Sequence, residues 1–115
     1  MLLKEYLLEV KKSKFYAYYY EVHSKDEVDS ILNDIKKEHK KARHIPYVYK
    51  IDNLIKKTDD GEPSNTAGMP IYNVIDKNNL NNCLIVIVRY FGGIKLGAGG
   101  LFRAYSTSAA EVIRG

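Results

Sequence analysis

The segment that most constrains this chain spans residues 89–105 and reads RYFGGIKLGAGGLFRAY. An unbroken apolar run, residues 83–88, precedes it, and apolar residues at helical spacing follow it. This pattern predicts a buried strand, a glycine-rich turn and a helix. Because glycine costs folding entropy, such a cluster needs a reason: a positive φ, close backbone packing, or a ligand against the main chain. Five of the chain's eight glycines lie in this turn: Gly92, Gly93, Gly97, Gly99 and Gly100.

The cations around this turn favour an anion site. Arg89, Lys95 and Arg103 frame it without an intervening acid, and free amides at a helix N-terminus attract anions. The spacing matches neither the dinucleotide fingerprint nor a P-loop. The pattern therefore leaves two interpretations open, phosphate or nucleic-acid contact and tight strand–helix packing. The predicted phosphate-binding residues are Arg89, Gly92, Gly93, Lys95, Gly97, Gly99, Gly100 and Arg103.

Length and composition indicate one globular domain. The 115 residues suffice for one core but not for two. No apolar stretch is long enough to span a bilayer, and the N-terminus lacks a signal-peptide core, so we expect no membrane contact. Cys83 is the sole cysteine, which excludes disulfides and favours the cytoplasm. Because an apolar strand surrounds its thiol, we expect a raised pKa and no nucleophilic role.

The net charge of +4 is modest but unevenly distributed. Beyond residue 88, four cations face Glu111 alone, and a second excess lies at residues 36–43. We interpret the lysines of the second group as a solvated helix face. An alternative is that they belong to a surface that follows phosphates.

The chain is predicted to follow the order ββαβαβα. Strands are expected at 2–10, 14–22, 45–51 and 83–88, and helices at 24–40, 66–76 and about 101–113. Ser24 and Glu27 form a capping box at the first helix. Residues 52–65 are predicted to be a polar connection. The fold class is therefore an α+β two-layer sandwich, a four-stranded sheet with helices mainly on one face.

Aromatic residues are concentrated in the second predicted strand. They could form a platform on which bases stack, although such platforms need exposed rings. We favour the simpler interpretation that they fill one face of a half-covered sheet. The residues are Phe15, Tyr16, Tyr18, Tyr19 and Tyr20.

An acidic loop carries the second informative pattern. Asp59, Asp60 and Glu62 lie within four residues, just before a predicted helix. Acids at a helix start are stabilising, and this structural role is the favoured interpretation. The alternatives are magnesium binding and general acid–base catalysis with His44. The candidate catalytic residues are His44, Asp59, Asp60 and Glu62. No metal site is predicted, and magnesium is the one cofactor considered. His23 and His39 are predicted to be surface residues.

Two long motifs resemble a known family. Residues 59–68 (DDGEPSNTAG) and 89–105 are similar, in sequence and in order, to motifs of the N-terminal domain of the YigZ/IMPACT family. Residues 12–15 (KSKF) and 42–44 (ARH) resemble its weaker motifs, so the likeness covers nearly the whole chain. Asn65 stands where the family commonly has glycine, which argues against an obligatory positive φ there.

The resemblance implies both a fold and a role. The fold is that of the second domain of a small-subunit ribosomal protein, with a rare left-handed βαβ crossover. Eukaryotic members regulate translation during amino-acid starvation through a protein partner that activates an initiation-factor kinase, and nucleic-acid or ribosome contact is the usual proposal for bacterial members. Bacterial members usually add a C-terminal ferredoxin-like domain. We expect residues 1–115 to be the N-terminal domain, with that second domain absent from this chain.

Three functional hypotheses follow. The leading one is a cytoplasmic, translation-regulating module that contacts RNA or the ribosome through the basic glycine-rich turn. The second is an enzyme acting on a phosphorylated substrate, with the acidic loop and His44 meeting the glycine-rich turn in one cleft. The third is a protein-interaction domain that binds a regulatory partner and no small ligand.

Overall fold

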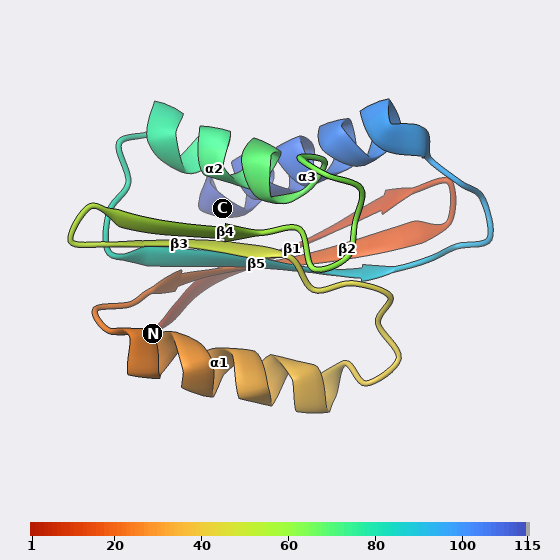
Figure 1. Ribbon diagram of the computed structural model, residues 1–115. Helices are drawn as coiled ribbons and strands as arrows, with labels where there is room; N and C mark the ends of the chain where they lie inside the picture. The colour runs from red at the N-terminus through yellow and green to blue at the C-terminus, as the bar shows by residue number, and fades with distance from the viewer. Residues whose placement is uncertain (115) are drawn as a thin grey trace.

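Five antiparallel strands form one sheet, in the order β1-β2-β5-β3-β4. The computed structural model describes residues 1–114, in which three helices pack on this sheet (Figure 1). Among these residues, no helix is both long and apolar enough to cross a membrane. The elements are β1 (Leu2–Val10), β2 (Ser13–Glu21), α1 (Lys25–Glu38), β3 (Tyr47–Ile51), β4 (Leu54–Thr58), α2 (Gly68–Lys77), β5 (Cys83–Tyr90) and α3 (Gly97–Arg114).

The fold is α+β as predicted, but the prediction of four strands was wrong. The additional strand, β4, lies inside the stretch predicted to be a polar connection. It pairs with β3 alone, so it is an edge strand, and four of its five residues are exposed. An exposed edge strand has no buried face and therefore lacks the alternation by which strands are recognised. A turn at Asp52 and Asn53, both with positive φ, joins it to β3.

The central strand β5 explains the unbroken apolar run. It lies between β2 and β3, and its residues alternate between two cores. Cys83, Ile85 and Ile87 join the core beneath α2 and α3. The remaining apolar residues of the strand, Leu84, Val86 and Val88, join the core beneath α1. A strand buried on both faces needs apolar residues at every position.

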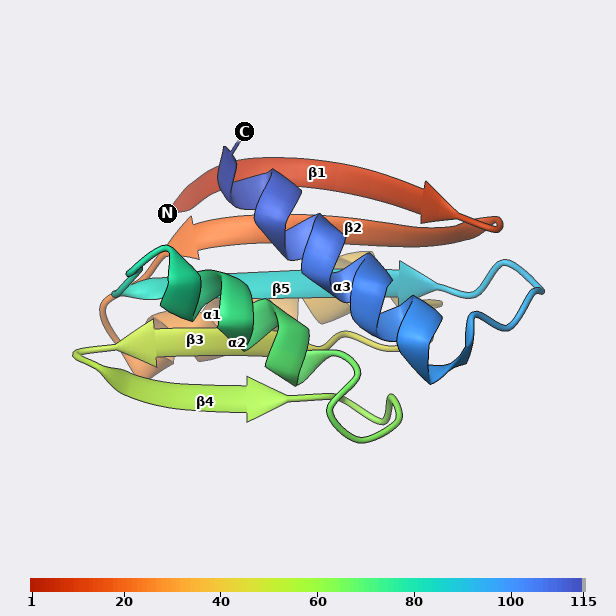
Figure 2. The same cartoon turned by 90° about the horizontal axis from the view of Figure 1, so that it is seen from above.

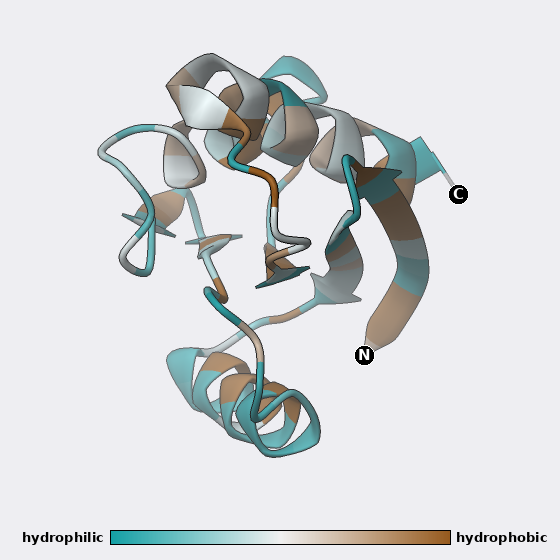
Figure 3. Cartoon of the chain, turned by 90° about the vertical axis from the view of Figure 1, so that its right-hand side faces the viewer, coloured by the Kyte–Doolittle hydropathy of each residue, from teal (hydrophilic) through white to brown (hydrophobic). Residues whose placement is uncertain are grey.

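The helices cover both faces of the sheet. Figure 1 shows α2 and α3 on one face and α1 on the other, which adds a third layer to the predicted two. Figure 3 shows the apolar side of α1 turned toward the sheet, where Val28, Leu32 and Ile35 are buried. The predicted capping box begins this helix, since the Glu27 amide donates to Ser24 Oγ at 3.2 Å. The sequence identified the buried stripe of α1 but contained no signal for the face that it covers.

The path of the chain brings the two long motifs to one end of the sheet. Both β4 and β5 are antiparallel to β3, so they run parallel to each other. The connection between them passes through α2 on the face turned to the viewer in Figure 2, and its sense there is left-handed. The acidic loop follows β4 and the glycine-rich turn follows β5, so both begin at the same end of the sheet. His44 and Arg43 precede β3, which starts at that same end of the sheet.

Candidate functional site

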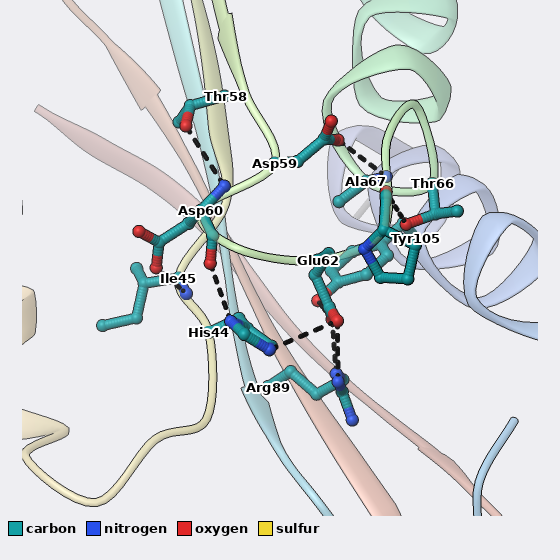
Figure 4. Close-up of polar contacts among 11 residues, drawn as sticks. His44, Ile45, Thr58, Asp59, Asp60, Glu62, Thr66, Ala67, Arg89 and Tyr105 are labelled. Carbon is teal, nitrogen blue, oxygen red and sulfur yellow. Dashed lines mark hydrogen bonds and ion pairs between the residues drawn. The ribbon is translucent and has the colours of Figure 1, made fainter. Parts of the chain in front are cut away.

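A buried carboxylate, Glu62, joins the acidic loop to the rest of the fold. Its side chain is 1% exposed and forms an ion pair with Arg89. Arg89 donates from Nη2 to Oε1 at 2.7 Å and from Nε to Oε2 at 2.5 Å. The Tyr105 hydroxyl also donates to Oε2, and His44 Nε2 lies 3.5 Å from Oε1. Figure 4 shows the four side chains converging.

The role of Tyr105 was not predicted from the sequence. Its ring lies in the core beneath α3 and packs edge-on against Phe15. Burial and then the charge of Glu62 raise the pKa of its phenol, so the hydroxyl stays protonated and donates. The available signal was chemical, because a tyrosine on the buried face of a helix needs a partner for its hydroxyl.

The other two acids of the loop bind backbone amides. Asp59 Oδ1 accepts from the Ala67 and Gly68 amides at 3.1 and 2.8 Å, and so caps α2, whose own N-cap residue has no side-chain acceptor. Asp60 Oδ2 accepts from the Ile45 amide at 2.7 Å. These contacts support the structural interpretation of the loop. Within residues 1–114, no group of three or more His, Cys, Asp or Glu side chains is placed to hold a metal ion.

The orientation of His44 is fixed by the same loop. Its Nδ1 lies 2.7 Å from the Asp60 carbonyl oxygen. Because a carbonyl can only accept, Nδ1 carries a proton and Nε2 is the nitrogen turned toward Glu62. The enzyme hypothesis required all the acids to meet the glycine-rich turn. Glu62 alone meets Arg89, whereas Asp59 and Asp60 stabilise the loop.

A cleft of about 580 Å³ lies between the acidic loop and the glycine-rich turn. Its volume is in the range typical of small-ligand sites. Arg89 and Glu62 are at its buried side, while Lys95 and Arg43 are exposed. The Arg43 guanidinium stacks on the Phe91 ring, 4.9 Å from its centre. The cleft is lined by Arg43, His44, Glu62, Pro63, Arg89, Phe91, Lys95, Leu96, Gly97, Ala98 and Leu101.

The glycines of the turn have different structural roles. A Cβ on Gly92 would stand 2.1 Å from the Lys12 carbonyl carbon, so this glycine allows close packing on the β1–β2 turn. Gly93 and Gly97 have φ values of +92° and +72°, which L-residues rarely adopt. Gly99 meets neither condition, because the nearest atom to its notional Cβ is Arg103 Nη1 at 3.6 Å. Close packing therefore explains Gly92, and a positive φ explains Gly93 and Gly97.

Comparison with known proteins identifies the family. The family model for the Impact N-terminal domain matches residues 11–113. The chain belongs to this family. IMPACT family member YvyE of Bacillus subtilis is 44% identical over 110 residues, which are 93% of this chain and 51% of YvyE. IMPACT family member YigZ of Escherichia coli is 32% identical over 111 residues, 92% of this chain and 54% of YigZ. The chain spans about half the length of these relatives.

Solved structures show the same fold. A hypothetical protein of known crystal structure matches 96% of this chain and 56% of its own length, with a TM-score of 0.92 and 29% identity. The two-domain translational regulator Yih1 matches 98% of this chain and 45% of its own, with a TM-score of 0.55 and 22% identity. The resemblance of the two motifs to the IMPACT family is therefore confirmed.

One expectation drawn from the IMPACT motifs was wrong. Asn65 has a φ of +63°, so the position where the family commonly has glycine does adopt the left-handed conformation. Asparagine tolerates this region better than most residues. Its amide donates to Asp59 Oδ2 at 2.9 Å, which holds the turn in place beside the cap of α2.

Arg103 does not line the cleft of this IMPACT-family domain. It is exposed and borders a separate hollow of about 190 Å³, together with Lys11 of the β1–β2 turn. Helix α3 carries the two sites on different sides, because Leu101 faces the cleft and Ala104 the hollow. The predicted phosphate-binding residues are thus divided between two neighbouring surfaces.

The aromatic residues of β2 pack mainly within the protein. Phe15 is fully buried, and the tyrosines of the strand are partly buried against the two cores. His39, predicted to be a surface residue, is partly buried. It hydrogen-bonds to the hydroxyls of Tyr18, at 2.9 Å, and Tyr90, at 2.6 Å. These contacts support the interpretation that the aromatic residues of β2 pack on the sheet and do not form a platform for bases. Cys83 is buried as expected, and burial raises the pKa of its thiol to about 11.

Proposed function

We propose that this domain is a translation-regulating module that contacts RNA, free or in the ribosome, through a basic surface around the end of β5. The observation that carries the proposal is the clustering of exposed cations around the end of β5. Half of the 18 lysines and arginines of the chain are exposed there. The carboxylates of Glu9 and Glu38 lie among them, and the acidic loop with Asp59, Asp60 and Glu62 lies at the same end of the sheet. The exposed cations are Lys11, Lys12, Lys14, Lys37, Lys40, Lys41, Arg43, Lys95 and Arg103.

Segments far apart in the sequence contribute these cations. Lys14 pairs in register with Tyr90 at the end of β5, and the Lys12 backbone packs on Gly92. On the other side of the sheet, lysines from the end of α1 line a hollow of about 360 Å³ with Tyr90. Figure 3 views the molecule from this end. The α1 lysines, interpreted from sequence as a solvated face, therefore extend the basic surface around the glycine-rich turn.

A surface of this kind suits the sugar–phosphate backbone. Each lysine or arginine that neutralises a phosphate releases counterions, which gives affinity that falls with salt and depends little on sequence. The amides in the first turn of α3 have no intrahelical acceptor and can add hydrogen bonds to phosphate oxygens. The role in translation is supported by the resemblance of the motifs, and Yih1, which is a translational regulator, shares the fold.

The test is RNA binding at two salt concentrations. Fluorescence anisotropy would follow binding of single- and double-stranded RNA at about 50 and about 200 mM salt. We expect affinity to fall steeply with salt, and the slope to decrease by about one unit in Arg103→Ala and about two in Lys95→Ala/Arg103→Ala. Lys77→Ala is the matched control, because Lys77 is exposed at the far end of α2. Absence of binding by the folded wild type would refute the proposal.

A second candidate function is contact with a regulatory protein. Three large apolar side chains in or beside the glycine-rich turn are exposed: Phe91 (40%), Ile94 (45%) and Phe102 (39%). Exposed aromatic and aliphatic residues among cations are typical of protein interfaces. Substituting Ile94 by serine would weaken such a contact while leaving the salt dependence of RNA binding unchanged, and a pull-down with each variant separates the two functions.

A further inference from the structure

We propose that the cleft beside the glycine-rich turn binds the terminal phosphomonoester of a nucleotide, at the end of an RNA strand. This inference rests on the proposed function and names the group that the cleft takes. It concerns the cleft lined by Arg43, Arg89 and Lys95, and not the wider basic surface.

One nitrogen of the Arg89 guanidinium is left over by the ion pair with Glu62. The Arg89 side chain is 8% exposed, and Glu62 accepts from its Nε and Nη2. Its third nitrogen, Nη1, donates to no acceptor within residues 1–114. Figure 4 shows this end of the guanidinium turned away from Glu62, and Arg89 lines the cleft. Nη1 is not among the fully buried side-chain atoms that lack a partner, so it is open to the cleft and can donate to an acceptor bound there.

Two more cations stand at the cleft without carboxylate partners. Within the described part of the chain, neither Lys95 nor Arg43 has an acid at ion-pair distance. Stacking on Phe91 holds the Arg43 guanidinium beside the cleft. With Arg89 there are three cations against the one carboxylate of Glu62, a surplus of two. A phosphomonoester carries a charge of about −1.5 to −2 near neutral pH, whereas an internal phosphodiester carries about −1. The charge of the cleft fits the terminal group better.

Gly99 lies in the first turn of α3. A glycine in a helix costs about 1 kcal/mol relative to alanine, and here neither a positive φ nor a close neighbour requires it. Of the three reasons for a glycine, a ligand lying against the main chain is the one that remains. Gly97 and Ala98, in the same turn, line the cleft, and Gly99 stands beside Arg103.

The size and the apolar lining of the cleft indicate more than a bare phosphate. Its volume of about 580 Å³ exceeds the needs of one phosphate group. Pro63, Phe91, Leu96 and Leu101 supply apolar surface around the charged side, where a ribose and a base could lie. Aromatic contact with a base is worth about 1–3 kcal/mol and tolerates any sequence.

The experiment compares one RNA of about ten nucleotides with a 5′-phosphate, a 3′-phosphate or hydroxyls at both ends. We expect at least one phosphorylated form to bind about tenfold more tightly than the hydroxyl form. Lys95→Ala should abolish this difference, and Lys77→Ala should preserve it. Because Lys95 is exposed, its substitution should leave the fold intact, which circular dichroism would check. Equal affinities of all three RNAs would overturn the inference, while salt-dependent binding of all three would leave the proposed function standing.

Adenosine 5′-monophosphate distinguishes a free nucleotide from a strand end. Competition by this nucleotide against the phosphorylated RNA, lost in Lys95→Ala, would support the cleft as the site. Binding of the nucleotide without binding of any RNA would support the phosphomonoester site and refute the RNA contact of the proposed function. Failure of the nucleotide to compete at millimolar concentration would count against the cleft.

Discussion

Glu62 and Arg89 form a bidentate ion pair in which the carboxylate is 1% exposed and the guanidinium side chain 8% exposed. The pair joins the acidic loop to the central strand, so both IMPACT-family motifs meet in one contact. Because Arg89 neutralises Glu62, the arginine predicted from sequence as a phosphate ligand is first a structural partner. The one nitrogen left over, Nη1, is what connects this structural pair to the cleft.

Removing the charge of Glu62 should destabilise the fold. In Glu62→Gln, the buried Arg89 loses its counter-charge, and breaking a buried pair from one side costs about 3–5 kcal/mol. Urea unfolding, monitored by circular dichroism, measures the free energy of unfolding. Exchange of an exposed acid, Asp34→Asn, is the control and should change it by less than about 0.5 kcal/mol. An equally small effect for Glu62→Gln would mean that the pair does not hold the loop.

Asp59→Ala should affect stability without affecting RNA binding. Its carboxylate caps α2 through the Ala67 and Gly68 amides, and losing an N-cap costs about 0.5–2 kcal/mol. Asp76→Ala, at the exposed C-terminal turn of the same helix, should cost nothing, because an acid there opposes the helix dipole. Thermal unfolding and RNA titration of both variants check this. A loss of RNA affinity in folded Asp59→Ala would show that the loop has a direct functional role.

Two glycines of the turn should respond in opposite directions to substitution by alanine. Gly92→Ala places a Cβ 2.1 Å from the Lys12 backbone, and such overpacking costs about 1–3 kcal/mol. Gly99→Ala makes an ordinary contact, with its Cβ 3.6 Å from Arg103 Nη1, and should raise the unfolding free energy by up to about 1 kcal/mol through helix propensity. The same substitution should weaken binding of phosphorylated RNA. If Gly99→Ala were destabilising, the argument that the fold does not need this glycine would fail.

The stability of the protein should fall at alkaline pH, in part because of Tyr105. Burial and then the charge of Glu62 raise its pKa in the folded state, while in the unfolded chain the phenol ionises near pH 10. The group therefore favours folding fully below about pH 10, and its contribution is lost as the pH rises further. One such proton changes the unfolding free energy by about 1.4 kcal/mol per pH unit.

Tyr105→Phe separates this effect from other ionisations. Tyr18 and Tyr20, whose pKa values burial raises to about 12, titrate in both proteins and so cancel in the comparison. Urea unfolding between about pH 8 and about pH 11 should show a shallower alkaline decline in the variant. Identical slopes would indicate that Tyr105 ionises as freely in the folded state as in the unfolded one.

The sequence predicted those elements whose burial is periodic or complete. Strand β5 was recognisable because burial on both faces requires an unbroken apolar run. Helix α3 was recognisable because burial on one side leaves apolar residues at helical spacing, and the glycines mark the turn between the two. Strand β4 was missed because an exposed edge has no such pattern, and the side of the sheet that α1 covers is a property of the chain's path. A residue pattern specifies what must be buried but not against which partner.

The sequence allowed the prediction that the two motifs contribute to one site, but not which side chains contact each other there. An arginine beside glycines looks the same whether it binds a phosphate or Glu62, because the deciding residue is 27 positions away. Arg103 lies two residues beyond Leu101, which lines the cleft, yet it borders a different hollow, because residues two apart on a helix point in different directions. The lysines of α1 were assigned to solvent from their own segment, and their place beside β5 depends on the tertiary fold.

The most direct test of the basic surface around the end of β5 is a two-dimensional NMR titration of the labelled domain with a short single-stranded RNA. We expect the chemical-shift changes of the amides to concentrate in the first turn of α3, at Lys95 and Arg43, and at the Lys11–Lys12 turn. Amides near Lys77, at the opposite end, should remain unchanged. Shifts confined to that opposite end, or no shifts at salt concentrations where the domain is folded, would contradict the account.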